Sequence, residues 1–289
     1  MGDDLLARAI SLHVHKRSGD AEVLYREILR REPDHPVALE GLAGLMFERG
    51  QLAQAMALFA RGLAGRPNSA LLHGNLGEVL RLMGRQDDAE RHLKRAVEID
   101  PRSAQAWNSI GLLAHDRARH AEAESAYREA LRLRPRFPAA LINLANALQA
   151  LNRRHEAVVA LQDAIQIEPD SPIALTNLGQ VLTDLGDPNS LELAEAHCRR
   201  ALSVDPLQPH AINNLGHVLR LQGRLDEAAG VFRQALARDR GLAAAHHGLG
   251  LTLMEMGRLD EAELCFREAL GIDPAHAVSW MALARLQGE

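Results

Sequence analysis

A proline recurs at an interval of 34 residues in this chain of 289, and that spacing constrains the fold more than any other feature. The interval holds from Pro33 to Pro169, widens to 37 residues at Pro206, and resumes through Arg240 to Pro274. A fixed period of roughly 20 to 50 residues is typical of stacked repeats, each consisting of one supersecondary unit. The chain is therefore expected to be an array of similar units.

Small and bulky residues recur at the same interval as the proline. We number the positions of each unit so that the linker proline is position 32. Position 20 is alanine in all eight units: Ala21, Ala55, Ala89, Ala123, Ala157, Ala194, Ala228 and Ala262. Position 8 is always small: Ala9, Ala43, Gly77, Gly111, Ala145, Gly179, Gly216 and Gly250. Position 24 is bulky except at Cys198: Tyr25, Phe59, Leu93, Tyr127, Leu161, Phe232 and Phe266. This pattern predicts two helices per unit that approach most closely at the small residues.

A glycine separates the two helical halves of most units and should reverse the chain. Apolar residues recur at helical spacing on both sides of Gly223. The same joint is Gly50, Gly84, Gly186 and Gly257 elsewhere, with Lys16, Ala118 and Asn152 in the other units. Glycine takes the left-handed conformation there without a steric penalty. Three additional residues within 187–193 are expected to lengthen this turn in the sixth unit, and Arg240-Gly241 is expected to loosen the linker that lacks proline.

The pattern resembles the tetratricopeptide repeat, in which W-x2-L-G-x2-Y is followed by A-x3-F and then P on a 34-residue period. The slots are filled most clearly by Trp107, Ile110, Gly111, Ala123, Tyr127 and Pro135. The resemblance implies an all-α fold, a right-handed α-solenoid of eight repeats plus a C-terminal helix, forming a single domain over residues 1–289. The expected repeats are 2–35, 36–69, 70–103, 104–137, 138–171, 172–208, 209–242 and 243–276, with a terminal helix at 277–287.

Composition narrows the functional classes. Aromatic residues make up 3% of the chain and the formal net charge is −5, so no basic footprint for nucleic acid or an anionic membrane is visible. No signal peptide is expected from the acidic MGDDLL start, and no membrane helix is expected because no apolar run reaches about 18 residues. Cys198 and Cys265 form no disulfide framework or CxxC motif and are expected to be inert apolar residues. A cytoplasmic location is expected.

No arrangement of residues predicts catalysis, a cofactor or a metal. His155-Glu156 begins like HExxH, but Val159 stands where the second histidine is needed. His210, His217 and the pair His246-His247 are candidates for a metal or pH-sensing site, although packing roles are favoured. His73 and His246 occupy the slot of Trp107 and Trp280, so each is expected to pack with one solvated nitrogen. We expect a protein without enzymatic activity.

Amide side chains are the candidate ligand-binding residues. By the resemblance, the first helices of the repeats line a concave groove, with positions 2, 5, 6, 9, 12 and 13 facing it. The candidates on these helices are Asn75, Asn108, Asn143, Asn146, Asn177, Gln180, Asn213 and Asn214, beside Ser109 and Thr176. A carboxamide can pair with both the C=O and the N–H of a peptide bond. The alternative is that these amides orient neighbouring helices through hydrogen bonds to local backbone.

The sequence therefore predicts a scaffold that holds an extended polypeptide through an asparagine ladder. The ladder also resembles the superhelical domain of O-linked N-acetylglucosamine transferases and bacterial repeat proteins with a glycosyltransferase or sulfotransferase domain. The alternative function is thus the substrate-recruiting segment of a larger enzyme. In chaperone-binding members of the family, lysines at positions 2 and 5 form a clamp for a C-terminal carboxylate. Such a clamp is disfavoured here because position 5 never holds lysine. Mixed groove charges favour a neutral to mildly basic segment as partner. Self-association through the terminal repeats stays open. RNA binding is disfavoured.

Overall fold

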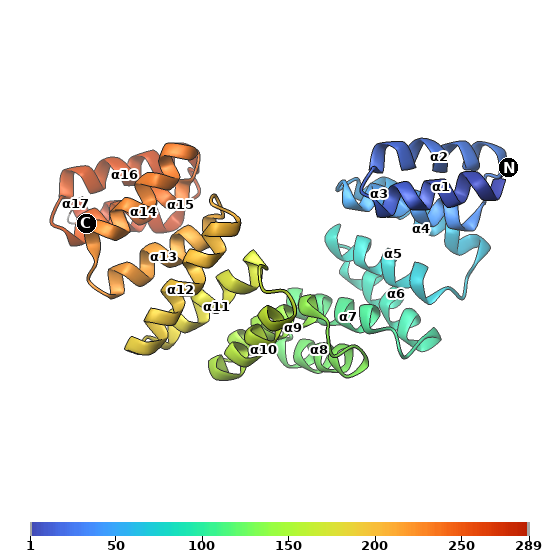
Figure 1. Ribbon diagram of the computed structural model, residues 1–289, viewed down its shortest axis with the longest axis horizontal. Helices are drawn as coiled ribbons and strands as arrows, with labels where there is room; N and C mark the ends of the chain where they lie inside the picture. The colour runs from blue at the N-terminus through green and yellow to red at the C-terminus, as the bar shows by residue number, and fades with distance from the viewer. Residues whose placement is uncertain (1, 288–289) are drawn as a thin grey trace. The chain divides into compact units, whose positions relative to one another are not determined.

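The computed structural model describes residues 2–287, and within them the chain is all-α. Each of the eight expected repeat ranges holds two helices, which we call the A-helix and the B-helix (Figure 1). The helices are α1 (Gly2–Val14), α2 (Ser18–Arg31), α3 (Pro36–Glu48), α4 (Leu52–Gly65), α5 (Ala70–Leu82), α6 (Gln86–Ile99), α7 (Ala104–Asp116), α8 (His120–Leu133), α9 (Pro138–Ala150), α10 (Arg154–Ile167), α11 (Pro172–Leu185), α12 (Pro188–Val204), α13 (Pro209–Leu221), α14 (Leu225–Arg238), α15 (Ala243–Glu255), α16 (Leu259–Ile272) and α17 (Ala277–Gln287).

The turn between the A-helix and the B-helix contains a residue with positive φ in every repeat. Five of these turns contain a glycine with φ between 71° and 76°. Lys16, Ala118 and Asn152 take the same left-handed conformation, with φ of 59°, 57° and 61°. A residue with a β-carbon loses about 1–2 kcal/mol there. The fold tolerates that cost at three joints, so packing of the hairpins outweighs the strain in the turn.

The sixth repeat differs from the expectation of a longer turn. Helix α12 begins at Pro188 and has 17 residues, whereas the other B-helices have 14. Asp187 caps it by accepting a hydrogen bond from the backbone N–H of Ser190 at 3.0 Å. Proline suits the first helical position because its missing N–H is not needed there. The three additional residues therefore extend the helix by nearly one turn, and the prediction of a lengthened loop was wrong.

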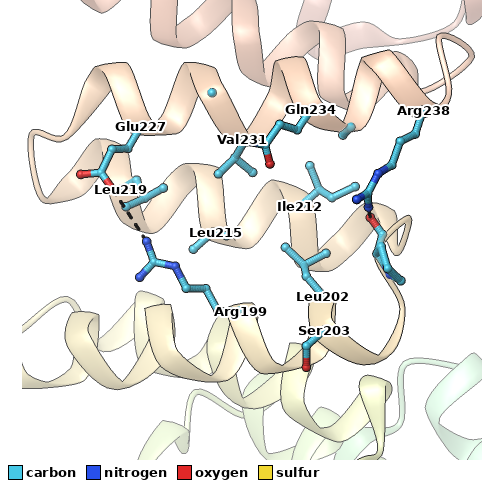
Figure 2. A pocket seen from close by; sticks show the side chains of 13 residues that line it. Arg199, Leu202, Ser203, Ile212, Leu215, Leu219, Glu227, Val231, Gln234 and Arg238 are labelled. Atoms are coloured by element: carbon cyan, nitrogen blue, oxygen red, sulfur yellow. Dashed lines mark hydrogen bonds and ion pairs between the residues drawn. The ribbon is translucent and has the colours of Figure 1, made fainter.

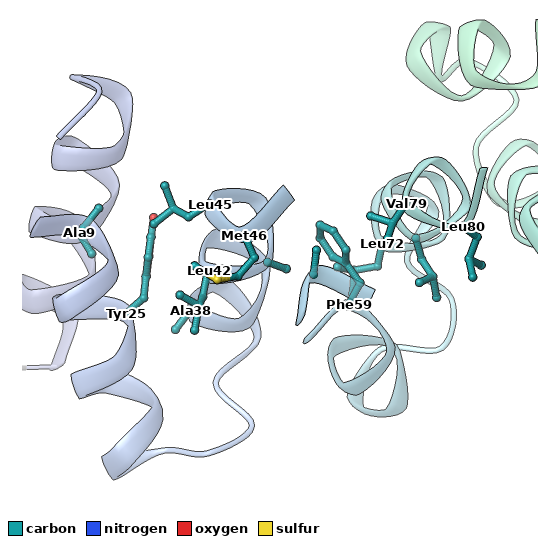
Figure 3. Packing of buried hydrophobic residues seen from close by; sticks show 14 of the residues in the cluster. Ala9, Tyr25, Ala38, Leu42, Leu45, Met46, Phe59, Leu72, Val79 and Leu80 are labelled. Carbon is teal, nitrogen blue, oxygen red and sulfur yellow. The ribbon is translucent and has the colours of Figure 1, made fainter. Parts of the chain in front are cut away.

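The chain divides into two compact units, residues 1–143 and 144–289. In the first unit, the core includes Tyr25 and Phe59, which lie among leucines from α3 and α5 (Figure 3). In the second, Phe232 and Phe266 occupy the same position of their repeats and are at most 2% exposed. All eight position-20 alanines have 0% exposure. The organisation as one continuous domain stays a prediction.

Close helix contact explains the small residue at position 8. A Cβ atom built on Gly250 would lie 2.6 Å from Cε1 of Phe266, and one built on Gly77 would lie 2.7 Å from Cγ of Leu93. Real Cβ contacts are essentially never under 3.0 Å. At Gly77 and Gly250 the position-24 side chain of the B-helix therefore lies too close to the A-helix of its own repeat to leave room for a Cβ atom, whereas Ala9, Ala43 and Ala145 fill the same position in other repeats.

Ion pairs connect consecutive repeats through their B-helices. Glu90 of α6 binds Arg117 at the end of α7, and Glu195 of α12 binds Arg224, which precedes α14, at 2.8 Å. Lys94 and Arg117 hold the pKa of Glu90 at about 2. The Glu195 side chain is only 10% exposed. Because burial makes an unpaired charge costly, the pair of Glu195 with Arg224 favours one register between neighbouring hairpins.

Candidate functional site

The A-helices lie beside one another within each unit, and their shared surface is the candidate site. In the first unit α5 packs on α7, and in the second α13 packs on both α11 and α15. A pocket of about 280 Å³, here called the A-face pocket, opens on this surface between α3, α5 and α7. It is lined by Gly44, Phe47, Glu48, Phe59, Gly74, Asn75, Glu78, Gln105, Ala106 and Ser109. All of these except Phe59 and Ala106 occupy the positions that the resemblance places in the groove.

Carboxylates dominate the charge around the A-face pocket. Arg81 donates to both oxygens of Glu78, at 2.8 and 3.1 Å, and also binds Asp116 of α7. Burial opposes the charge on Arg81, but its hydrogen bonds to Glu78 and Asp116 outweigh this and raise its pKa. Glu48 contacts Nε2 of His13 at 3.4 Å. Three carboxylates and one guanidinium thus carry the charge of this surface.

The same arrangement of charges recurs between repeats. A cation at position 12 faces an acid at position 13 of the next repeat in Arg81–Asp116 and in Arg220–Glu255, where Nε of Arg220 donates at 3.1 Å. Arg81 and Arg220 are therefore already neutralised by acids of the protein. The remaining charge in the A-face pocket is acidic.

Several of the predicted amides bind one another or the adjacent helix. Asn143 donates its Nδ2–H to Oδ1 of Asn108 at 3.0 Å, and Asn177 donates to Oδ1 of Asn146 at 3.1 Å. Each pair connects A-helices of consecutive repeats. A carboxamide has two N–H donors and one oxygen. Asn143 and Asn177 each use one N–H in these bonds. Within residues 2–287, the second N–H and the side-chain oxygen of each are not hydrogen-bonded.

The other predicted amides have different environments. Asn214 donates to the carbonyl oxygen of Thr176 at 3.2 Å, and Gln180 donates to Oδ1 of Asp184 at 2.9 Å. Asn75 lines the A-face pocket and makes no side-chain hydrogen bond to the described part of the chain. Asn213 is half-buried on α13. The role of orienting neighbouring helices is therefore seen at Asn143, Asn177 and Asn214, and ligand binding by these amides stays a prediction.

A bond to the linker explains why histidine can replace tryptophan at position 4. Trp107 Nε1–H donates to the carbonyl oxygen of Pro101 at 3.0 Å, six residues earlier. Trp280 and His246 repeat this bond at 3.0 and 3.2 Å. A ring N–H at this slot satisfies the linker carbonyl, and the constant six-residue offset was the sequence signal.

His73 makes the same linker bond and one more contact. Its Nε2–H donates to the carbonyl oxygen of Pro67 at 3.0 Å, and its Nδ1 lies 2.9 Å from Nδ1 of His92. Both ring nitrogens therefore have partners in the protein. The expectation of a solvated nitrogen was wrong at His73.

Of the histidines weighed as a metal or pH-sensing site, His247 has a packing role, as the sequence favoured. The structure places His247 against His276, with ring centroids 5.2 Å apart, and both Nδ1 atoms contact Oγ of Ser279, at 3.0 and 2.7 Å. His210 and His217 have exposed side chains. Residues 2–287 contain no group of three or more histidine, cysteine or acidic side chains arranged to hold a metal.

Both cysteines are shielded, though to different degrees. Burial raises the pKa of the Cys198 thiol to about 12, and it also raises that of Cys265, which is half-buried. Both thiols therefore stay protonated at neutral pH, and a thiol in that state is a weak nucleophile.

A second pocket, which sequence reasoning missed, lies on the B-helix side of the second unit. It has a volume of about 570 Å³ and lies between α12 and α14, over α13 (Figure 2). Arg199 and Glu227 face each other across it at 3.8 Å. Its floor, from Ile212, Leu215 and Leu219, is at most 4% exposed. The floor therefore offers little apolar surface to a ligand, and the apolar contacts of this pocket come from Leu202 and Val231 on its walls.

The family follows from this geometry and from comparison with known proteins. The family described as "Cilia and flagella-associated protein 70 C-terminal domain" matches residues 5–205, and "Tetratricopeptide repeat" families match 189–243 and 219–286. The chain belongs to the first of these families, which is one of tetratricopeptide repeats. No curated protein sequence matches this chain.

Solved structures share the fold. A chain of the APC/C hetero-tetramer Cut9–Hcn1 matches 98% of this chain with a TM-score of 0.71 and 22% identity. This chain spans 55% of that chain's length. Pseudomonas aeruginosa PilF matches 73% of this chain and 94% of its own, with a TM-score of 0.61 and 17% identity. YrrB, described as a tetratricopeptide repeat protein with an unusual peptide-binding site, matches 66% of this chain and 96% of its own, with a TM-score of 0.50 and 23% identity.

Membrane spanning was considered separately. Across residues 2–287, every helix is too short or too polar to serve as a membrane span.

Proposed function

We propose that this chain is a protein-interaction scaffold that holds an extended polypeptide against its A-helix face. The observation that carries the proposal is the set of amides on the A-helices of each unit, among which Asn143 in the first unit and Asn177 in the second each keep a donor and an acceptor after binding a neighbouring asparagine. The peptide bond presents the complementary groups in every residue. An amide row therefore binds a main chain with little dependence on its sequence.

Two further observations support a polypeptide as the ligand. Asn75 lies in the A-face pocket, and its side-chain amide makes no hydrogen bond to another group within residues 2–287. The description of YrrB names a peptide-binding site in a chain with this fold. Acidic charge at the A-face pocket favours a neutral to mildly basic segment over an acidic one.

The test starts by selecting ligands from a random 15-residue peptide library against the full chain. The dissociation constant of a selected peptide is then measured by fluorescence anisotropy for wild type and for the triple variant Asn143→Ala, Asn177→Ala, Asn214→Ala. At about 1 kcal/mol per lost hydrogen bond, the three substitutions together should lower the affinity on the order of 100-fold. Circular dichroism establishes that helicity is retained.

The matched control removes amides from a B-helix. Gln162 and Gln166 are exposed on α10, so Gln162→Ala with Gln166→Ala should leave the affinity unchanged. Equal affinities for wild type and the asparagine variant refute the ladder. Asn75→Ala adds a variant that breaks no observed hydrogen bond, and we expect it to weaken binding alone.

The enzyme-linked hypothesis assigns the same binding surface to a substrate-recruiting segment. The intact mass of the native protein from its source, compared with that of these 289 residues, distinguishes it from a free-standing scaffold.

A further inference from the structure

The A-face pocket exists because two glycines face it. A Cβ atom built on Gly74 would have Ala96 Cβ as its nearest neighbour, at 4.0 Å, and one built on Gly44 would lie 3.7 Å from Cε1 of His13. Both sites have room for a side chain, unlike the position-8 glycines, and the space remains open. At about 280 Å³ the pocket is slightly smaller than the roughly 300–1,000 Å³ typical of small-molecule sites. Its size suits one long side chain.

The charges at the A-face pocket leave one carboxylate available. Both oxygens of Glu78 accept hydrogen bonds from Arg81, which also binds Asp116. The Glu48 side chain is 58% exposed, and its ion-pair partner within the described residues is His13, at 3.4 Å. A histidine carries charge only when protonated. Glu48 is therefore the group at this pocket most able to bind a new cation.

Phe47 provides the apolar wall beside this carboxylate. It is half-buried, lies next to Glu48 in sequence, and lines the same pocket. Lysine and arginine pack their aliphatic stems on apolar surface while their charged ends stay near water or an acid. An aromatic ring also attracts a cation. A carboxylate beside an aromatic wall thus fits a long basic side chain better than an apolar or acidic one.

We propose that the A-face pocket binds a lysine or arginine side chain of the extended polypeptide, with Glu48 as its charge partner and Phe47 as the wall for its stem. This inference rests on the proposed function. Asn75, in the same pocket, is placed to bind the main chain next to that basic residue. The partner is thus a segment with a basic residue at a fixed point of an otherwise loosely read main chain.

Two small probes test the pocket without a peptide. N-acetyl-lysine methylamide and its uncharged analogue N-acetyl-norleucine methylamide are titrated into the full chain labelled with 15N-glycine, and the amide signals of Gly44 and Gly74 are followed by NMR. The lysine probe should move both signals in a saturable way. The norleucine probe should produce shifts at least five-fold smaller at equal concentration.

Three variants sharpen the result. Glu48→Gln should reduce the lysine response to the norleucine level. The matched control is Glu255→Gln, which changes the same repeat position where the acid is held by Arg220, and it should leave the response unchanged. Gly74→Leu fills the space, so it should abolish the response of Gly44 while the urea midpoint stays at or above that of wild type.

Equal responses to both probes, or a lysine response that survives Glu48→Gln, overturn the inference. If either of these results is found while selected peptides still lose affinity in the asparagine variant, the scaffold function stands and only the basic subsite is refuted. If the lysine probe binds as expected but the asparagine variant binds peptide like wild type, the subsite stands and the ladder falls.

Discussion

Substitution of Gly250 by alanine tests whether the close approach of a position-24 side chain requires glycine at position 8. The new Cβ would lie 2.6, 2.9 and 3.0 Å from three ring carbons of Phe266, a side chain with 0% exposure. The ring must move by about 0.4–0.8 Å to bring the closest contact to 3.0–3.4 Å. Overpacking of this kind costs about 1–3 kcal/mol. Alanine in place of glycine regains about 0.8–1.0 kcal/mol of helix propensity, so we expect a net loss of about 0–2 kcal/mol.

Gly230→Ala is the control that isolates the packing cost. Gly230 lies in α14, one helix earlier, and a Cβ there would meet no atom within 4 Å. It makes the same chemical change without a clash and should stabilise the chain by about 0.5–1 kcal/mol. Urea unfolding followed by circular dichroism should therefore separate the two midpoints by on the order of 0.5–1 M, with wild type between them. If Gly250→Ala were as stable as Gly230→Ala, close approach would not explain the small residue at position 8.

Three further predictions concern the linkers and the histidines. Hydrogen exchange should show the fastest amides between helices around Arg240-Gly241, where proline is missing, and uniform protection across residues 172–276 would contradict this. Trp107→Phe should lose about 1 kcal/mol of stability in urea unfolding because the Pro101 carbonyl loses its hydrogen-bond donor. His73→Trp should keep the bond to its linker. Equal stability of Trp107→Phe and wild type would show that the linker bond does not stabilise the repeat. Burial, His276 and Arg220 lower the pKa of His247 to about 4, so the unfolded chain takes up a proton near pH 6.5 before the folded chain does. The contribution of His247 to stability should be full above about pH 6.5 and decline as the pH falls to about 4. His92, His115, His197 and His217 also have lowered pKa values, so His247→Gln should make the fall of the urea midpoint in this window shallower without removing it. Identical pH profiles for the variant and wild type would contradict the assignment.

Features that depend on the repeat period could be predicted from the sequence. The constant spacing of alanine at position 20 predicted residues that are fully buried in every repeat, and the joint at position 15 has positive φ even at Ala118. The period averages over eight repeats, so a rule of packing appears as a repeated residue. The A-face positions followed from the family resemblance, and eight of them line one pocket.

Features peculiar to one repeat could not be predicted in this way. The insertion in the sixth repeat looked like a longer turn, yet Asp187 and Pro188 begin a helix there, a local signal that the period does not contain. The pairing of Asn143 with Asn108 and the neutralisation of Arg81 depend on side-chain direction between repeats. The space at Gly44 and Gly74 depends on what the neighbouring helices leave open, which spacing alone does not report.

The claim that a polypeptide binds the A-helix face is tested most directly by photocrosslinking. A benzophenone group is attached at residue 105 through Gln105→Cys, which lines the A-face pocket with an exposed side chain, and in a second variant at residue 162 through Gln162→Cys on the B-helix α10. Each variant is irradiated with a peptide selected from the random library, and the crosslinked site is read by mass spectrometry. The scaffold account predicts capture of the peptide from residue 105 and not from residue 162. Capture from residue 162 alone would place the ligand on the opposite set of helices and contradict it.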